Sequence, residues 1–145
     1  MKLLLRPVET TDAELLLLWR NDEQTRKSSH NTDFVSYKSH TSWLSKSLVN
    51  PNRILCIAEL SHKPIGTVRA DYLPDLGEWE LSWTISPDYR GQGFGKGMLE
   101  FFSKRFEEPI IAEVKSLNIS SIKIAEHIGM KIVKEVDNVL YFRRD

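Results

Sequence analysis

Residues Glu80 to Leu99 read ELSWTISPDYRGQGFGKGML, and this stretch decides how the chain folds. Around its start, apolar residues alternate with polar ones, which is the period of a strand with one apolar face. The apolar positions are Trp79, Leu81, Trp83 and Ile85. Pro87 ends this strand, and from Gly91 to Gly97 every second residue is glycine. Apolar residues then recur at helical spacing, at Met98, Phe101, Phe102 and Phe106. The stretch therefore predicts a strand, a glycine loop and a helix.

The glycine loop indicates a site for a phosphate group. Glycine lets the backbone approach a ligand closely, because it carries no Cβ atom. A helix that starts after such a loop presents unpaired N–H groups and the positive end of its dipole, and both favour an anion. Arg90 and Lys96 add positive charge at the two ends of the loop. A plain turn before a buried helix is the alternative, and four alternating glycines with flanking cations make it the weaker one.

Two common phosphate motifs are absent from this loop. The motif of nucleoside triphosphatases needs Ser or Thr after Gly-Lys, but Gly97 follows Lys96. The dinucleotide fingerprint needs a glycine three residues after Gly-x-Gly, where Gly91 and Gly93 are followed by Lys96. The loop does contain Arg-x-x-Gly-x-Gly, from Arg90 to Gly95. This segment resembles the pyrophosphate-binding motif of the GNAT superfamily of acyl-coenzyme A dependent N-acetyltransferases.

Composition narrows the function classes. With 145 residues the chain is expected to form one domain over residues 1–145. Its 20 basic and 20 acidic residues cancel, which disfavours a nucleic-acid partner. The sequence has no apolar run of about 18 residues and no signal segment, so we expect a cytoplasmic protein without a membrane partner. Cys56 lies in an apolar run and is expected to be a buried thiol rather than a nucleophile.

The expected elements follow the order β-α-α-β-β-β-α-β-α-β-β, which indicates an α/β domain with a mixed sheet and helices on both sides. A capping box of Thr11 and Glu14 is expected to start the first helix, which would turn Leu15, Leu18 and Trp19 inward. Segment 22–36 is expected to be a loop or an irregular helix. Ser36 and Asn118 are expected to cap two later helices. Strand 109–114 is apolar enough to be buried on both faces.

The GNAT fold has the same order, so the resemblance covers essentially the whole chain. It implies a sheet of about seven strands in which the fourth and fifth, here 79–86 and 109–114, splay apart around the pantetheine arm. It implies acetyl-coenzyme A as the acetyl donor and no metal. A backbone N–H near Ile85, freed by a bulge, would meet the thioester carbonyl. The implied coenzyme-binding residues are Ile85, Arg90, Gly91, Gln92, Gly93, Phe94, Gly95, Lys96, Asn118 and Ser121.

Acetyl transfer to an amine requires a neutral amine, because an alkylammonium with a pKa near ~10 leaves only about one molecule in a thousand able to attack at pH 7. Glu80, on the polar face of the strand, is the candidate base, and similar GNAT enzymes often carry a carboxylate there. An ordinary surface glutamate is an equally weighted alternative. Glu78 has the same parity but sits beside a turn, so it is the weaker candidate.

The departing thiolate needs a proton, and here the chain departs from the family pattern. Many members carry a tyrosine seven residues after the amide that Asn118 matches, but this chain has Ala125. Ser121 or His127 could substitute for it. Solvent could also supply the proton, because a thiol with a pKa of about 8 to 9 leaves without much help.

The acceptor side also carries a resemblance. The chain resembles a GNAT branch that acetylates nucleotide-linked amino sugars for surface glycans, including the pseudaminic acid route. The resemblance rests on Trp19-Arg20-Asn21, Arg26, His30, His40-x-x-Trp43 and Arg69. This implies that Arg20, Arg26 and Arg69 hold a diphosphate, that Trp43 stacks on a base or sugar, and that His30 lines the site. The alternative places the tryptophans in the core and the arginines in solvent, and for the tryptophans it is favoured.

Other functions remain open at this point. The acceptor could be a protein N-terminus, as in the ribosomal-protein acetyltransferases that the chain also resembles. A non-catalytic acyl-coenzyme A binding module is supported only by the missing tyrosine, and a plain interaction domain is disfavoured by the glycine loop. The sequence identifies neither the acceptor amine nor the pathway, and it leaves a homodimer possible.

Overall fold

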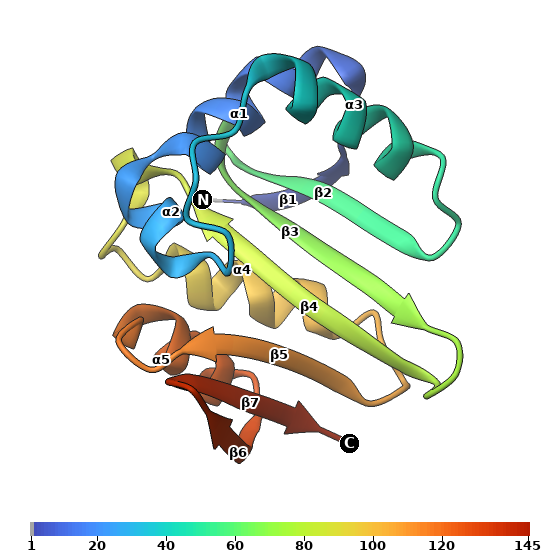
Figure 1. The fold of residues 1–145 in the computed structure, drawn as a ribbon, viewed down its shortest axis with the longest axis vertical. Coiled ribbons are helices and arrows are strands. Elements are labelled where there is room, and N and C mark those ends of the chain that lie inside the picture. Colours follow the sequence, from blue (N-terminus) through green and yellow to red (C-terminus); the bar gives the residue numbers. More distant parts are fainter. Residues whose placement is uncertain (1) are drawn as a thin grey trace.

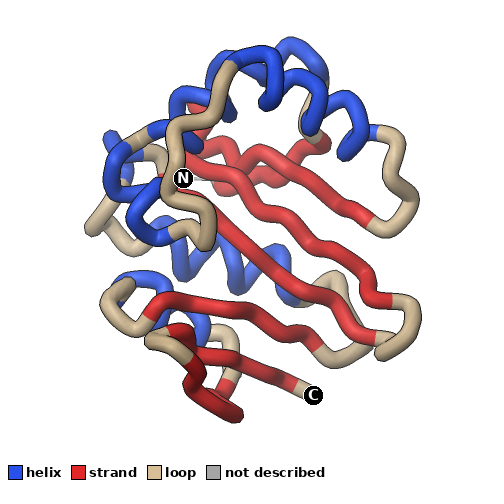
Figure 2. Tube along the Cα trace, in the orientation of Figure 1, coloured by secondary structure: helices blue, strands red, loops and turns tan. Residues whose placement is uncertain are grey.

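The computed structural model describes residues 2–145, which form a seven-stranded sheet in the order β1-β2-β3-β4-β5-β7-β6 (Figures 1 and 2). Neighbouring strands are antiparallel except β4 and β5, which are parallel. The expected α/β class and mixed sheet are confirmed. The strands are β1 (Leu3–Pro7), β2 (Arg53–Leu60), β3 (Lys63–Leu73), β4 (Glu78–Ile85), β5 (Ile110–Lys115), β6 (Lys131–Val136) and β7 (Val139–Arg144).

Helices cover the sheet on both sides (Figure 1). On one side lie α1 (Ala13–Asn21), α2 (Glu23–Ser28) and α3 (Tyr37–Leu48), and on the other lie α4 (Phe94–Ser103) and α5 (Ile119–His127). The short helix α2 occupies the polar segment that was expected to be a loop or an irregular helix. Within residues 2–145, no helix combines the length and the apolar character needed to cross a membrane.

Two of the three predicted helix caps are confirmed. The Ser36 hydroxyl accepts the N–H of Ser39 at 3.1 Å, and Asn118 Oδ1 accepts the N–H of Ser121 at 3.2 Å. The expected box of Thr11 and Glu14 is wrong, because a 3₁₀ turn over Thr10–Asp12 precedes α1. The carboxylate of Asp12 instead accepts the N–H of Glu9 at 2.8 Å.

The inward face of α1 differs from the prediction. Leu16 and Trp19 are buried, whereas Leu18 is 69% exposed. Residues 15–18 are all leucine, so more than one face of the helix is apolar in the sequence, and the packing decides which face is buried.

Two hydrophobic clusters flank the sheet. The larger one packs α4 and α5 against β3, β4, β5 and β7, and its fully buried side chains include Ile65, Leu81, Met98 and Phe102. Cys56 belongs to it, and burial raises the pKa of its thiol, as expected for a structural cysteine. The smaller cluster lies under α1 and α3 and comprises Val8, Ala13, Leu16, Trp19, Leu44, Leu55 and Ile57.

The strands β4 and β5 pair over a very short distance. Their only register pairs within residues 2–145 are Trp79 with Ile110 and Glu80 with Ile111. Burial of β5 on both faces was expected, and this is wrong. Ala112 and Val114 are buried in the larger cluster, but Glu113 between them is exposed. Its side chain contacts His30, which follows α2.

A substitution at Gly66 tests the packing of β3 against β4 and α4. A Cβ atom there would come within 2.6 Å of the Thr84 backbone oxygen and 3.0 Å of Met98 Sδ. We expect Gly66→Ala to lower the free energy of unfolding by about 1–3 kcal/mol, as overpacking does. Gly97→Ala on α4 is the control, because its Cβ would meet nothing closer than Leu3 at 3.9 Å. It should stabilise by up to about 1 kcal/mol through helix propensity. Denaturant unfolding of both variants measures these changes, and a Gly66→Ala protein as stable as wild type would contradict this packing.

Candidate functional site

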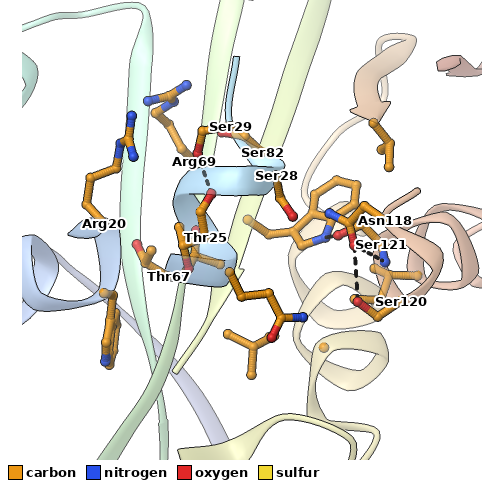
Figure 3. A pocket seen from close by; sticks show the side chains of 18 of the residues that line it. Arg20, Thr25, Ser28, Ser29, Thr67, Arg69, Ser82, Asn118, Ser120 and Ser121 are labelled. Carbon is orange, nitrogen blue, oxygen red and sulfur yellow. Dashed lines mark hydrogen bonds between the residues drawn. The ribbon is translucent and has the colours of Figure 1, made fainter. Parts of the chain in front are cut away.

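One continuous cavity of about 1110 Å³ lies where β4 and β5 separate. On one side it is lined by the glycine loop and the start of α5, and on the other by α1, α3 and β3. Figure 3 shows Arg20 and Arg69 on one side and Asn118, Ser120 and Ser121 on the opposite side, with Thr25, Ser28 and Ser29 of the α2 segment between them. The cavity therefore joins two chemically different walls.

The glycines of the loop serve two purposes rather than one. Gly91 and Gly93 have φ values of 73° and 81°, which side-chain-bearing residues rarely adopt. Gly93 is the N-cap of α4, so the N–H groups of the first turn of this helix have no helical partner. Gly95 lies inside α4, where a Cβ would come within 2.5 Å of Ile124 Cδ1. Its small size therefore allows α4 to pack on α5, while the residue also lines the cavity.

The two cations of the loop both line the cavity, but they differ in their contacts. Arg90 donates to Asp22 Oδ2 at 2.6 Å and to Thr25 Oγ1 at 3.0 Å, so it ties the loop to α2. Burial alone would raise the pKa of Asp22, but the hydrogen bonds from Arg90 and the Thr25 amide lower it overall. Lys96 lies in the first turn of α4. Gln92 does not line the cavity, and its Nε2 donates to the Asp88 carbonyl at 3.3 Å.

The amide of Ile85 faces the gap without the expected bulge. The pairing of β3 with β4 runs without a register shift from Gly66 and Ile85 to Leu73 and Glu78. The N–H of Ser86 donates to the Ile65 carbonyl on the β3 side at 2.8 Å. Successive residues of a strand direct their N–H groups to opposite edges, so that of Ile85 points toward β5. Because β4 and β5 have already separated there, the splay alone frees this amide.

The start of α5 brings Asn118 and Ser121, both predicted to bind the coenzyme, to the wall of the cavity. Trp83 Nε1 on β4 donates to Ser121 Oγ at 3.1 Å, which links the two elements across the gap. Ala125 is completely buried in the core. His127 does not line the cavity and contacts Glu100 Oε2 at 3.2 Å. Of the two substitutes considered for the missing tyrosine, only Ser121 reaches the site.

Glu80 lines the cavity at the point where β4 and β5 part. Burial raises the pKa of its carboxyl, and the neighbouring carboxylates of Glu113 and Asp71 raise it further. Arg69 opposes these effects. Glu78 does not line this cavity and forms an ion pair with Arg143 of β7. Of the two carboxylates considered as base, only Glu80 faces the site.

The wall formed by α1, α3 and β3, on the side predicted to hold the acceptor, carries two guanidinium groups. Burial lowers the pKa of Arg20 and of Arg69, and the nearby Arg53 and Arg20 lower that of Arg69 further. Arg20 Nη2 donates to the Asn31 carbonyl at 2.8 Å. Arg20 Nη1 and Arg69 Nε are buried and have no hydrogen-bond partner among residues 2–145, although Asp71 Oδ2 lies 3.2 Å from Arg69 Nε. Arg20 Nη1 is therefore the unsatisfied donor of the two, while Arg69 Nε lies within ion-pair distance of Asp71.

The other residues predicted for the acceptor wall divide into two groups. His30 and Trp43 line the cavity. The Trp43 ring stacks on His40 with centroids 5.5 Å apart, and the Arg69 guanidinium lies 5.9 Å from its centroid. Arg26 does not line the cavity, because its guanidinium donates to the carbonyls of Asn21 and Thr32 within its own segment. Trp19 is 3% exposed and belongs to the core, as favoured from the sequence.

Glu113 lines the cavity and was not singled out from the sequence. Its Oε1 lies 3.2 Å from Nε2 of His30, which follows α2. The available signal was a single charged residue inside the apolar run from Ile110 to Val114.

Comparison with solved structures shows the same fold in several acetyltransferases. Spermidine N-acetyltransferase from Vibrio cholerae, in complex with CoA and spermine, is 16% identical, with a TM-score of 0.82 over 97% of this chain and 92% of that chain. Aminoglycoside acetyltransferase AAC(6')-Ib, in complex with coenzyme A, is 17% identical, with a TM-score of 0.81 over 99% and 94%. RimL, the ribosomal L7/L12 alpha-N-protein acetyltransferase, in complex with coenzyme A, is 11% identical, with a TM-score of 0.84 over 99% and 94%.

Sequence comparison gives the family. No curated protein sequence matches the chain significantly. Residues 2–131 match the family described as "Acetyltransferase (GNAT) domain", which is most of the 145 residues. Together with the splayed strands and the glycine loop before α4, this match shows that the chain belongs to the GNAT family of acetyltransferases.

Proposed function

We propose that this chain transfers the acetyl group of acetyl-coenzyme A to a primary amine by direct attack in a ternary complex. The observation that carries the proposal is the continuous cavity, which brings the glycine loop and the carboxylate of Glu80 to one opening between β4 and β5. Direct transfer needs both substrates in one site, and a cavity with two unlike walls can hold them together. The coenzyme A complexes of the structural neighbours support this choice of donor.

The donor wall suits a pyrophosphate and a thioester. The free N–H groups at the start of α4 and the Lys96 charge would hold the phosphates. The Ile85 amide would stabilise the negative charge that develops on the carbonyl oxygen during attack. Asn118 and Ser121 would contact the arm from α5. Arg90 would hold the loop against α2 through Asp22.

Glu80 would take the proton of the acceptor ammonium. A carboxyl with a raised pKa accepts a proton from an amine more readily than an ordinary one. The C–N bond then forms and the C–S bond breaks. The sulfur receives a proton from the Ser121 hydroxyl or from solvent, and the second proton lost by the nitrogen replaces it, so that one proton remains on Glu80. A thiol is a good leaving group, so this proton transfer needs little help.

The acceptor that the wall favours is an amino sugar linked to a nucleotide. The guanidinium groups of Arg20 and Arg69 both line the cavity and would suit the oxygens of a diphosphate, since charged hydrogen bonds of this kind are strong. Two positive charges on this wall disfavour a polycation such as spermine. A protein N-terminus, the acceptor type of RimL, remains the alternative.

Binding of the donor can be tested at Gly93. A carboxylate placed there would repel the phosphates, so we expect Gly93→Asp to weaken acetyl-coenzyme A binding at least tenfold by calorimetry, a change of about 1.4 kcal/mol. Gly77→Asp is the matched control, because Gly77 also has a positive φ, of 66°, and open space around it, but lies in the turn before β4. Equal affinities of the two variants would contradict the assignment of the loop.

The base can be tested with Glu80→Gln, which should lower turnover at pH 7 by about 10²-fold to 10⁴-fold and leave coenzyme affinity unchanged. The variant should also melt at a higher temperature at pH 7 to 8. The folded state raises the pKa of Glu80, so the stability linked to its protonated form is lost as the pH rises through that value, and glutamine avoids the loss. Near pH 4, where Glu80 is protonated in both states, the gain should vanish. A variant with the melting temperature of the wild type at every pH would contradict the raised pKa of Glu80 in the folded state.

The acceptor can be tested by coupled thiol release with a nucleotide-linked amino sugar, the free amino sugar, spermidine and an N-terminal peptide. We expect the nucleotide-linked sugar to give the highest kcat/KM. Arg20→Gln should raise its KM about tenfold, since a hydrogen bond to a charged group contributes about 1.5–3 kcal/mol, and should leave the free sugar unaffected. Arg26→Gln is the control, because Arg26 does not line the cavity. Preferential use of the peptide would replace the amino sugar by a protein N-terminus.

A further inference from the structure

Two carboxylates lie on one face of the sheet where β4 and β5 part. Glu80 is in register with Ile111, and Glu113 follows Ile111 by two residues, so all three share a face. Both carboxylates line the cavity. They come from adjacent strands, yet no backbone pairing joins the strands beyond Glu80. The pair therefore stands at the apex of the gap.

The charges around this pair leave it incompletely neutralised. On the β3 side, Asp71 lies 2.6 Å from Arg53 and 3.2 Å from Arg69. The positive charge of Arg69 also lowers the pKa of Glu80. On the β5 side, Glu113 contacts His30, whose side chain is 62% exposed. The nearest lysine of β5, Lys115, donates to the Lys27 carbonyl at 2.9 Å. One side of the pair therefore meets a half-buried arginine and the other meets a histidine open to solvent.

We propose that Glu113 is a positioning residue for the acetyl transfer, which holds a proton jointly with Glu80 and passes it through His30 to solvent. The inference rests on the proposed function and names the route by which the proton leaves. Acetylation of an ammonium by a thioester yields an amide, a thiol and one surplus proton. That proton moves from the amine nitrogen to the Glu80 carboxylate, then to Glu113, then through the imidazole of His30 to water.

The geometry explains why two carboxylates serve better than one. Two neighbouring carboxylates on one face of the sheet disfavour the state in which both are ionised, and this would favour a proton shared by the two groups. Burial and the contact with Glu113 both raise the pKa of Glu80, as does Asp71, while Arg69 lowers it. When both substrates fill the cavity that Glu80 lines, the contact of Glu113 with His30 would give the proton a path to solvent along the side of α2.

The test uses Glu113→Gln in the full chain, with two readouts. The titration of the Glu80 side chain, followed by carbon NMR, should move to lower pH in the variant, because the neighbouring negative charge is gone. The acid limb of the kcat/KM profile should move to lower pH as well, and the maximal rate should fall by roughly 10-fold, less than loss of the base itself. Glu100→Gln is the matched control, since Glu100 lies 3.2 Å from His127 but outside the cavity. It should change neither readout.

A second variant tests the exit. His30→Ala should slow turnover, and imidazole added to the buffer should restore part of the rate, which a purely structural role of His30 would not allow. An NMR titration of Glu80 that is identical in wild type and Glu113→Gln would contradict the sharing of a proton between Glu80 and Glu113. A shifted titration with an unchanged pH–rate profile would overturn the relay and leave the acetyl transfer standing. Coupled titration without thiol release from any amine would overturn the proposed function and the relay with it.

Discussion

The parting of β4 from β5 is the constraint on which the rest of the structure depends. Two register pairs, at Trp79 and Glu80, hold these parallel strands together. The backbone N–H groups of the two strands beyond these pairs need other hydrogen-bond partners. The larger hydrophobic cluster keeps the strands in place, because side chains of both pack on α4 and α5. The bond from Trp83 to Ser121 then spans the gap. An open sheet edge inside the domain thus lines the cavity.

The polar face of the sheet carries a row of charges that runs toward this gap. It begins with Arg53 on β2, continues through Asp71 and Arg69 on β3, and reaches Glu80 on β4 and Glu113 on β5. Arg53 and Arg69 both contact Asp71, whereas Glu80 has two carboxylates as neighbours, Asp71 in register on β3 and Glu113 on β5. Like charges therefore gather around Glu80, which is where a perturbed carboxylate is useful for the proposed chemistry.

Much of the donor half could be predicted from sequence, because its signals are local. The alternation before Pro87, the glycine loop and the cap at Asn118 are each read within a few residues. The failures involve contacts between distant segments. Four consecutive leucines do not say that Leu16 rather than Leu18 is buried, and strand parity does not separate Glu80 from Glu78, whose partner Arg143 is 65 residues away. Glu113 was overlooked because its apolar neighbours predicted burial, and only the splay exposes it.

The two hydrophobic clusters have a consequence for how such an enzyme can diversify. The helices of the acceptor wall, α1 and α3, are anchored by their own small cluster around Trp19 and Leu44, while the donor wall is anchored by the cluster around Met98 and Phe102. Residues that contact an acceptor can therefore be exchanged without repacking the half that holds the glycine loop. The architecture packs the half that would hold the common acetyl donor separately from the half that would contact the acceptor, which differs from one enzyme to the next.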